Sequence, residues 1–365
     1  MATLGQVGGA VVHQSRSSLV KCRSVPEQDT ELQLSCSRLK PMRKLLVAHA
    51  MTKWKVLTFL LCISAIGMFL REYESRMILT NTFQKSDTCP CWRCLPENDT
   101  WFLQCINQST EPFLSADYTL SEDIFNWWKL LQEEQRSFIT FRETVDRLFQ
   151  IFPPSPHFTD PSLQQCRTCA VVGNSANLKG SNQGHLIDAH DVIIRMNRGQ
   201  TKGYETDVGN RTTHRIMYPE SAMDLDNTTH LVLFPFKIQD LEWLIEALTT
   251  GFSGESYDTI KSSIKANKSL VIVMNPGFMR YVHDTWLEKN GKYPSTGFMA
   301  VVLALEVCDV VDVFGYGADK DGNWSHYWEE LKVKDLKTGI HSGTEEYNII
   351  QRLADRQKLK MYTRT

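Results

Sequence analysis

The sequence predicts an α/β domain with a mostly parallel central sheet flanked by helices. From Cys166 onward, short apolar runs of strand length alternate with longer segments of helical periodicity. That order is typical of strand–helix–strand units built on a parallel sheet. The 365 residues are 42% hydrophobic and 22% charged, which is ordinary globular composition and excludes disorder throughout.

The elements follow one another along the C-terminal two thirds of the chain. Apolar positions in residues 124–152 recur at helical spacing and predict two helices. A proline-rich loop follows, because Pro153, Pro154 and Pro156 interrupt regular structure. The expected strands are then 170–172, 192–194, 231–234, 270–274 and 310–314, and the expected helices are 239–248, 278–289 and 297–307.

Two predicted strands end in asparagine-containing turns. The first run ends at Gly173-Asn174-Ser175 and the second ends at Arg195-Met196-Asn197. Because ligands bind beyond the carboxyl ends of strands in an open α/β sheet, Asn174 and Asn197 are candidate ligand contacts. The alternative is that both asparagines only close turns.

Residues 54–70 form an apolar stretch about as long as the shortest bilayer-spanning helix. Lys and Arg residues precede it, so the positive-inside rule places residues 1–53 in the cytosol. We expect an uncleaved signal-anchor, with residues 71–88 as a stem and residues 89–365 as a lumenal domain. A cleaved signal peptide is the rival, but no small-x-small cleavage site follows. The tail of residues 1–53 can also derive from an upstream start.

Charge and cysteine usage narrow the partner and the compartment. A net charge of −2 provides no basic surface for nucleic acid, so we expect a small-molecule or glycan partner. Seven of the ten cysteines follow the apolar stretch, which leaves one without an intrachain partner. The pairs Cys91-x-x-Cys94 and Cys166-x-x-Cys169 could form a zinc site, but disulfides suit a lumenal protein better. Glycosylation sequons begin at Asn98, Asn107, Asn210, Asn227, Asn267 and Asn323.

The segment Tyr293-Pro-Ser-Thr-Gly297 stands directly before an apolar helical run. Ser295 or Thr296 can cap this helix, and the free N–H groups beside Gly297 can bind an anion. An ordinary capped helix is the alternative.

The run 310–314 leads to Gly317 and then to two histidines, His326 and His341. They could form a metal pair, a general base with an anion-binding partner, or surface loops. A zinc site is the weakest of these, because no third ligand has a recognisable spacing. We expect His341 in a loop, with a helix beginning between it and Glu346.

Acidic D-x-D pairs at 224–226 and 319–321 are of the type that holds a divalent metal against a diphosphate. Both lie in polar segments where paired aspartates arise by chance. We therefore expect no metal.

Four ordered segments together resemble a known family. They are Cys169-Ala-Val-Val-Gly-Asn-Ser, the Tyr-Pro-Ser-Thr-Gly segment with Cys308 beyond it, His326-Tyr-Trp-Glu329, and His341 with Glu346. In order, they resemble the long, short, third and very short sialylmotifs of animal sialyltransferases, from about Trp127 to the C-terminus. Four further features look most like the β-galactoside α-2,3-sialyltransferase type 1 and type 2 branch, which acts on Galβ1-3GalNAc. They are Trp127-Trp128, the Cys-x-Cys-x-x-Cys cluster, Arg-Met-Asn197 and Tyr218-Pro-Glu-Ser.

The resemblance implies a single Rossmann-like domain of a GT-A-like variant and a metal-independent, inverting transfer without a cofactor. The donor would be CMP-N-acetylneuraminate, and the acceptors galactose-terminated O-glycans or glycolipids. His341 would be the general base, and His326 would hydrogen-bond the departing phosphate. The implied donor or substrate contacts are Gln132, Asn174, Ser175, Asn197, Tyr257, Tyr293, Ser295, Thr296, Gly297 and Gly317.

The resemblance also implies disulfides Cys89–Cys94, Cys91–Cys166 and Cys169–Cys308, with Cys105 left over. The location would be the Golgi membrane, in single-pass type II orientation with a lumenal catalytic domain. The oligomeric state is open, and a homodimer is one option. Two features depart from the family: the tail before the apolar stretch is longer, and the loop from His326 to His341 is shorter. The competing hypotheses are an inactive membrane-anchored glycan-binding paralogue and a metal-dependent D-x-D glycosyltransferase.

Overall fold

A computed structural model describes residues 91, 99–155, 158, 166–318, 322–329 and 340–363. All of them belong to one compact unit, residues 87–365. The expected signal-anchor, the stem and the Cys89–Cys94 disulfide lie outside the described residues. Within the described part of the chain, no helix has the length and apolar character needed to cross a membrane.

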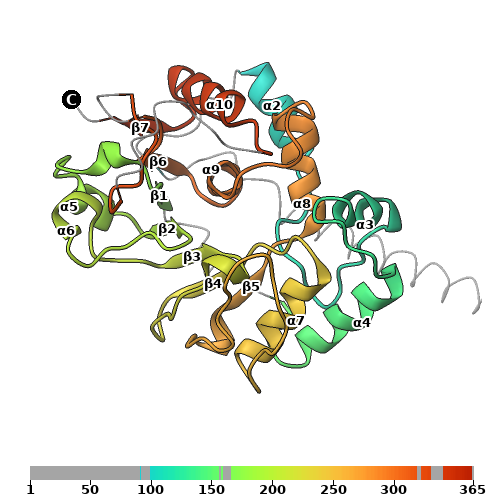
Figure 1. Cartoon of the computed structure of the whole chain (residues 1–365). Helices are drawn as coiled ribbons and strands as arrows, with labels where there is room; N and C mark the ends of the chain where they lie inside the picture. The colour runs from blue at the N-terminus through green and yellow to red at the C-terminus, as the bar shows by residue number, and fades with distance from the viewer. Residues whose placement is uncertain are drawn as a thin grey trace, which may run out of the picture. The chain divides into compact units, whose positions relative to one another are not determined.

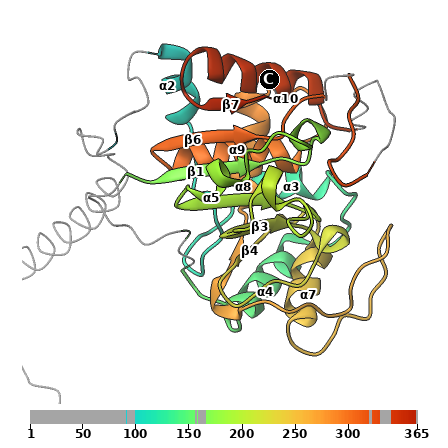
Figure 2. The same cartoon turned by 90° about the vertical axis from the view of Figure 1, so that its left-hand side faces the viewer.

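Seven strands form one sheet in the order β5-β4-β3-β2-β1-β6-β7, and every neighbouring pair is parallel (Figures 1 and 2). The strands are β1 Thr168–Val172, β2 Val192–Met196, β3 His214–Met217, β4 His230–Leu233, β5 Val271–Val273, β6 Val310–Phe314 and β7 Lys360–Tyr362. The parallel sheet is confirmed, as are all five expected strands. The sequence patterns missed β3, whose first two residues are polar, and β7, which has only three residues.

The longer helices begin where the apolar periodicity indicates. They are α2 Thr100–Ile106, α3 Glu122–Lys129, α4 Phe138–Phe149, α5 Gly184–Asp188, α6 Glu205–Val208, α7 Ile238–Ala247, α8 Pro276–Tyr281, α9 Thr296–Val307 and α10 Gly343–Asp355. The expected helix over 278–289 is instead α8 followed by a π-helical turn, Val282–Trp286. Side chains of Ser121 and Ser137 cap α3 and α4 by accepting hydrogen bonds from backbone N–H groups in the first turn.

The sheet is covered on both faces. Alternate residues of β1 point to opposite sides, so that Val171 joins the larger apolar core and Val172 joins a smaller one. The smaller core includes Ile187 of α5 and Val208 of α6. In Figure 1, α5 and α6 lie on one side of the sheet, and α7, α8 and α9 lie on the other. Burial on both faces explains why the central strands are apolar without alternation.

Helix α9 is the central helix of the larger core. Residues from Phe298 to Leu305 are all buried, as expected of a helix that is apolar all round. The helix packs on β1, β2, β3 and β6. Disulfides link Cys169 in β1 to Cys308 at the end of α9, and Cys91 to Cys166. Both of these expected pairings are confirmed, while Cys105 is a free, buried thiol.

The strand order reverses at β1. Strands β2 to β5 extend from one edge of β1, whereas β6 and β7 lie on its other edge. The connections leaving β1 and β6 therefore diverge, and such a switch point is where open α/β sheets bind ligands. This topology places the segments after Val172 and Phe314 side by side.

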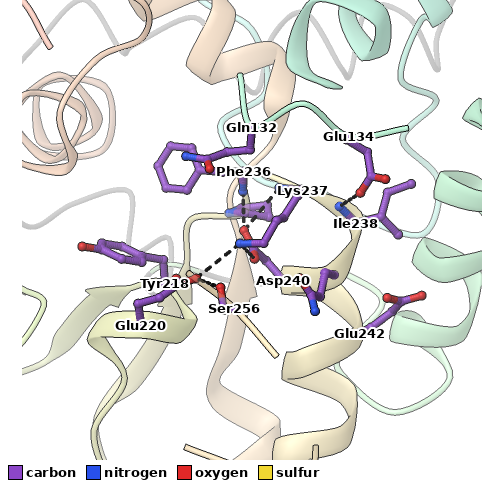
Figure 3. A network of polar contacts seen from close by, with 12 residues as sticks. Gln132, Glu134, Tyr218, Glu220, Phe236, Lys237, Ile238, Asp240, Glu242 and Ser256 are labelled. Carbon is purple, nitrogen blue, oxygen red and sulfur yellow. Dashed lines mark hydrogen bonds and ion pairs between the residues drawn. The ribbon is translucent and has the colours of Figure 1, made fainter. Parts of the chain in front are cut away.

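A partly buried ion pair joins the α3–α4 connection to α7. Glu134 accepts hydrogen bonds from the backbone N–H of Ile238 (2.9 Å) and from Arg136, which also bonds Glu242 at 2.7 Å. Figure 3 shows the contact between Glu134 and Ile238. Burial alone would raise the pKa of Glu134, but these hydrogen bonds lower it to about 2, from an ordinary value of 4.5.

Glu134→Gln is expected to lower the free energy of unfolding by about 1–2 kcal/mol at pH 7, since Arg136 is partly exposed and solvent screens the pair. The native pKa lies below the unfolded value, so the stabilisation is present above pH 4.5 and is lost as pH falls towards 2. Urea midpoints at pH 7 and pH 3 measure the difference. Glu143→Gln, on the exposed face of α4, is the control; an equal deficit at both pH values would contradict the assignment.

Candidate active site

The ends of β1 and β6 are in direct contact. The Gly173 N–H donates to the Phe314 carbonyl at 2.7 Å. A Cβ on Gly173 would lie 2.2 Å from the Gly315 carbonyl oxygen, and Gly315 itself has φ of 70°. Only glycine fits such a close approach of two backbones. The two turns that carry Asn174, Ser175 and Gly317 are therefore held side by side.

His326 lies against the first of these turns. Ser175 and His326 form an antiparallel bridge, and the Tyr327 N–H donates to the Asn174 carbonyl at 3.0 Å. The Ser175 hydroxyl donates to the Gly317 carbonyl at 2.5 Å. The structure thus brings together four of the expected site residues, although His326 is about 150 residues distant from Ser175 in the sequence.

The imidazole of His326 is oriented by its own segment. Its Nδ1 is hydrogen-bonded to Glu329, and its ring stacks on Trp328 with centroids 4.6 Å apart. The side chain is 43% exposed, so the ring remains accessible. With Nδ1–H donated to a carboxylate, Nε2 is the nitrogen that can face a ligand.

Asn174 and Asn197 follow neighbouring strands. Asn174 Nδ2 is 3.5 Å from the Met196 carbonyl oxygen, and the Ser221 hydroxyl donates to Asn197 Oδ1 at 3.0 Å. Asn197 has φ of 51°, so it does adopt the left-handed conformation typical of a turn-closing asparagine. Asn197 therefore closes a turn and also has its side-chain amide held in place at the end of β2.

The Tyr-Pro-Ser-Thr-Gly segment caps α9 and joins it to α10. The Ser295 hydroxyl accepts from the Phe298 N–H at 3.1 Å and donates to Glu346, while the Ser295 N–H donates to Glu346 at 2.7 Å. Burial raises the pKa of Glu346, and the bonds from Ser295 and the charge of His341 counteract it. Tyr316, after β6, donates to the Gly297 carbonyl at 2.9 Å. Ser295 to Gly297 therefore lie beside the β6 turn.

His341 precedes α10, which confirms its expected place in a loop before Glu346. Its Nδ1 lies 2.9 Å from the Tyr293 carbonyl oxygen. A carbonyl oxygen only accepts, so Nδ1 carries the proton and Nε2 is the basic nitrogen of neutral His341. The Tyr293 ring stands edge-on to the imidazole at 4.9 Å, and its hydroxyl accepts from Gln132 at 2.8 Å. Gln132, Tyr293 and His341 therefore form one continuous series of contacts.

Tyr257 is the expected site residue with the least packing, since it is 71% exposed. Its ring contacts Lys237, whose Nζ lies 5.6 Å from the ring centroid. Lys237 belongs to a buried polar network with Glu220 and Asp240 (Figure 3). The sequence patterns did not single out Lys237 or Asp240, because charged residues in a polar-looking turn are normally exposed.

The possible metal ligands are largely engaged elsewhere. Within the described residues no cluster of three or more His, Cys, Asp or Glu side chains could hold a metal ion. Asp226 accepts hydrogen bonds from Thr228 and Thr229. The alternative of a four-thiolate zinc site is wrong, because Cys166 and Cys169 belong to separate disulfides. The pair at 319–321 lies outside the described residues.

Gly173→Ala is expected to lower the free energy of unfolding by about 1–3 kcal/mol, because the added methyl group overpacks the contact with Gly315. Thermal unfolding measures the difference. Gly297→Ala, whose Cβ would meet Tyr316 at an ordinary 3.4 Å, is the control for stability; equal melting temperatures of the two variants would contradict the expectation.

Comparison with known proteins identifies the family. The model of glycosyltransferase family 29 (sialyltransferase) matches residues 113–358. The chain is 38% identical over 350 residues to the CMP-N-acetylneuraminate-beta-galactosamide-alpha-2,3-sialyltransferase 1 of Sus scrofa. This match covers 89% of this chain and 99% of that protein. It is 45% identical over 281 residues to the type 2 enzyme of Mus musculus, covering 75% and 79%.

A solved structure agrees with these relatives. The crystal structure of a mammalian sialyltransferase in complex with Gal-beta-1-3GalNAc-ortho-nitrophenol matches with a TM-score of 0.71 and 41% identity. The match covers 76% of this chain and 100% of that one. The fold, the ordered motifs and these similarities lead to one conclusion: the chain belongs to glycosyltransferase family 29, the sialyltransferases.

Proposed function

We propose that the protein transfers sialic acid from CMP-N-acetylneuraminate to the 3-hydroxyl of a terminal galactose, with Galβ1-3GalNAc glycans as acceptors. The observation that carries this proposal is the tautomer of His341: Nδ1 donates to the Tyr293 carbonyl, which leaves Nε2 as the basic nitrogen, and the Tyr293 hydroxyl in turn accepts from Gln132. The relatives named as α-2,3-sialyltransferases and the neighbour crystallised with a Galβ1-3GalNAc compound support the choice of linkage and acceptor.

In the proposed mechanism, His341 Nε2 removes the proton from the galactose 3-hydroxyl as that oxygen attacks C2 of the sialic acid. A bond forms between galactose O3 and C2, and the bond from C2 to the phosphate oxygen breaks. The electron pair leaves with CMP, and the proton remains on His341. Attack opposite the leaving group inverts the configuration at C2. A neutral imidazole whose other nitrogen is fixed by a hydrogen bond is suited to such a proton transfer.

His326 is proposed to stabilise the phosphate as negative charge develops on it. When the imidazole carries both protons, Nδ1–H donates to Glu329 and Nε2–H can donate to a phosphate oxygen. This cation takes the role that a divalent metal plays in D-x-D enzymes. We therefore propose a metal-independent reaction.

The remaining expected residues are proposed to hold the donor and the acceptor. Asn174 and Ser175 lie with Gly317 around the His326 bridge, so we assign them to the CMP moiety together with Asn197. The N-terminus of α9, at Ser295, Thr296 and Gly297, is assigned to the donor as well. The Ser295 N–H is bonded to Glu346, so the N–H groups of Thr296 and Gly297 are the ones suited to an anion. Tyr293 contacts His341, and Gln132 donates to the Tyr293 hydroxyl, so both are assigned to the acceptor sugar. Tyr257 is assigned to donor or acceptor.

The proposed location is the Golgi membrane, in type II orientation. Residues 1–53 would be the cytosolic tail, 54–70 the signal-anchor, 71–88 the stem and 89–365 the lumenal catalytic domain. Three kinds of observation support this arrangement: the basic residues before the apolar stretch, the glycosylation sequons, and two disulfides in the catalytic domain.

His341→Ala is expected to abolish transfer while leaving CMP binding measurable, because the base is lost but the β1–β6 turns are untouched. Loss of a general base costs about 10²–10⁴-fold in rate. Turnover of CMP-N-acetylneuraminate and calorimetry with CMP measure the two properties. His185→Ala, at an exposed position on α5, is the matched control. Near-wild-type transfer by His341→Ala would exclude His341 as the base.

An acceptor screen tests the function as a whole. We expect transfer to Galβ1-3GalNAc to exceed transfer to Galβ1-4GlcNAc and lactosylceramide, and the rate to be unchanged in excess EDTA. Product analysis after α-2,3-specific sialidase digestion identifies the linkage. Strict dependence on manganese would favour the D-x-D alternative, whereas CMP binding without transfer to any acceptor would favour an inactive glycan-binding protein.

A further inference from the structure

The turn between β4 and α7 is fixed by a buried carboxylate. Asp240 has no exposed surface and accepts hydrogen bonds from the N–H groups of Phe236 (2.7 Å) and Lys237 (3.2 Å). Its other oxygen lies 2.8 Å from Lys237 Nζ. The backbone and the side chain of Lys237 are therefore held by the same acid (Figure 3).

Lys237 extends from this turn towards the segment that contains Tyr257. Its Nζ is 3.4 Å from Glu220 Oε1 and 5.6 Å from the centroid of the Tyr257 ring. The Lys237 side chain is 15% exposed and that of Glu220 only 4%. Burial acts to lower the pKa of Lys237, but Asp240 and Glu220 raise it overall, so the amine stays charged. A cation at this distance from a tyrosine ring is attracted to its π face.

A second contact holds the residue before Tyr257. The Ser256 hydroxyl donates to Glu220 Oε1, the same oxygen that faces Lys237. Because Tyr257 is mostly exposed, packing does little to orient its ring. Two consecutive residues, Ser256 and Tyr257, are thus oriented by one buried ion pair.

The same turn also contacts the proposed acceptor side of the site. The Phe236 ring contacts two tyrosine rings: its centroid is 6.1 Å from that of Tyr218 and 5.1 Å from that of Tyr293. Tyr293 in turn holds His341 through its carbonyl oxygen. Burial and the charge of Glu220 raise the pKa of Tyr218 and of Tyr257. Both phenols therefore keep their protons at neutral pH and can donate to a ligand.

We propose that Lys237 is a positioning residue for substrate binding: held by Asp240 and Glu220, it fixes the orientation in which the Tyr257 phenol meets the substrate. The adjacent Phe236 packs against the Tyr293 ring and so helps to orient Tyr293. This inference rests on the proposed function, because it assigns Tyr257 to the substrate of that reaction. It adds a residue that does not touch the substrate itself.

Steady-state kinetics of the full chain, varying donor and acceptor separately, test the proposal in Lys237→Met, Tyr257→Ala and the double variant. We expect both single variants to raise the same KM by about tenfold, with a smaller change in kcat. The double variant should be no worse than Tyr257→Ala, because residues that act through one another are not additive. Lys237→Arg should recover part of the loss, since it keeps the charge.

Lys237→Met leaves Glu220 and Asp240 without their cation and can unfold the protein. Two further variants, Ser256→Ala and Lys261→Met, therefore separate an effect on positioning from an effect on folding. Ser256→Ala removes the second contact without uncovering a buried charge, and it should raise the same KM several-fold. Lys261→Met is the matched control, because Lys261 pairs with Asp224 in an ion pair that is about half exposed; its kinetics should equal those of the wild type.

Independent effects would overturn the proposal: a double variant whose loss equals the product of the single losses, or a Lys237→Met variant that lowers kcat with both KM values unchanged. A Ser256→Ala enzyme with wild-type KM values would also contradict it. If the wild-type protein transfers sialic acid but these couplings are absent, only the positioning role fails. Absence of any transfer by the wild type would instead reject the proposed function.

Discussion

The site depends on the close approach of two glycine turns at the ends of β1 and β6. Gly173 and Gly315 pack backbone against backbone, with no room for a side chain on either. This contact is possible only because β6 returns to the free edge of β1, where the strand order reverses. Asn174 and Gly317 stand directly beyond the contact, so their positions follow from the topology of the sheet.

Two kinds of interaction complete the site around that contact. On one side, hydrogen bonds between backbone groups attach the His326 segment to the β1 turn. On the other side, a buried carboxylate, Glu346, holds the cap of α9 and brings α10 close to it. His341 lies in the loop before α10 and is oriented by the Tyr293 carbonyl. The proposed base and the proposed phosphate-binding histidine are therefore positioned by different parts of the fold.

Local patterns were sufficient for five of the seven strands and for the motif residues, because apolar runs and capping serines can be recognised from neighbouring positions alone. They failed at β3, where His214 and Arg215 are polar yet buried, and at Lys237, whose burial depends on Asp240 and Glu220. A charged residue in a turn looks exposed unless its partners are known. Such partners are supplied by the tertiary structure and not by the neighbouring sequence.

The pairing of β1 with β6 also has a consequence for biosynthesis. Strand β1 cannot pair with its second neighbour, β6, until the chain has been synthesised as far as Phe314. The turns proposed to bind the donor can therefore form only when the ribosome has made most of the chain. Until then the apolar edge of β1 is exposed in the folding compartment, where such nascent edges are prone to aggregate and are bound by chaperones. The catalytic centre is among the last parts of the molecule to form.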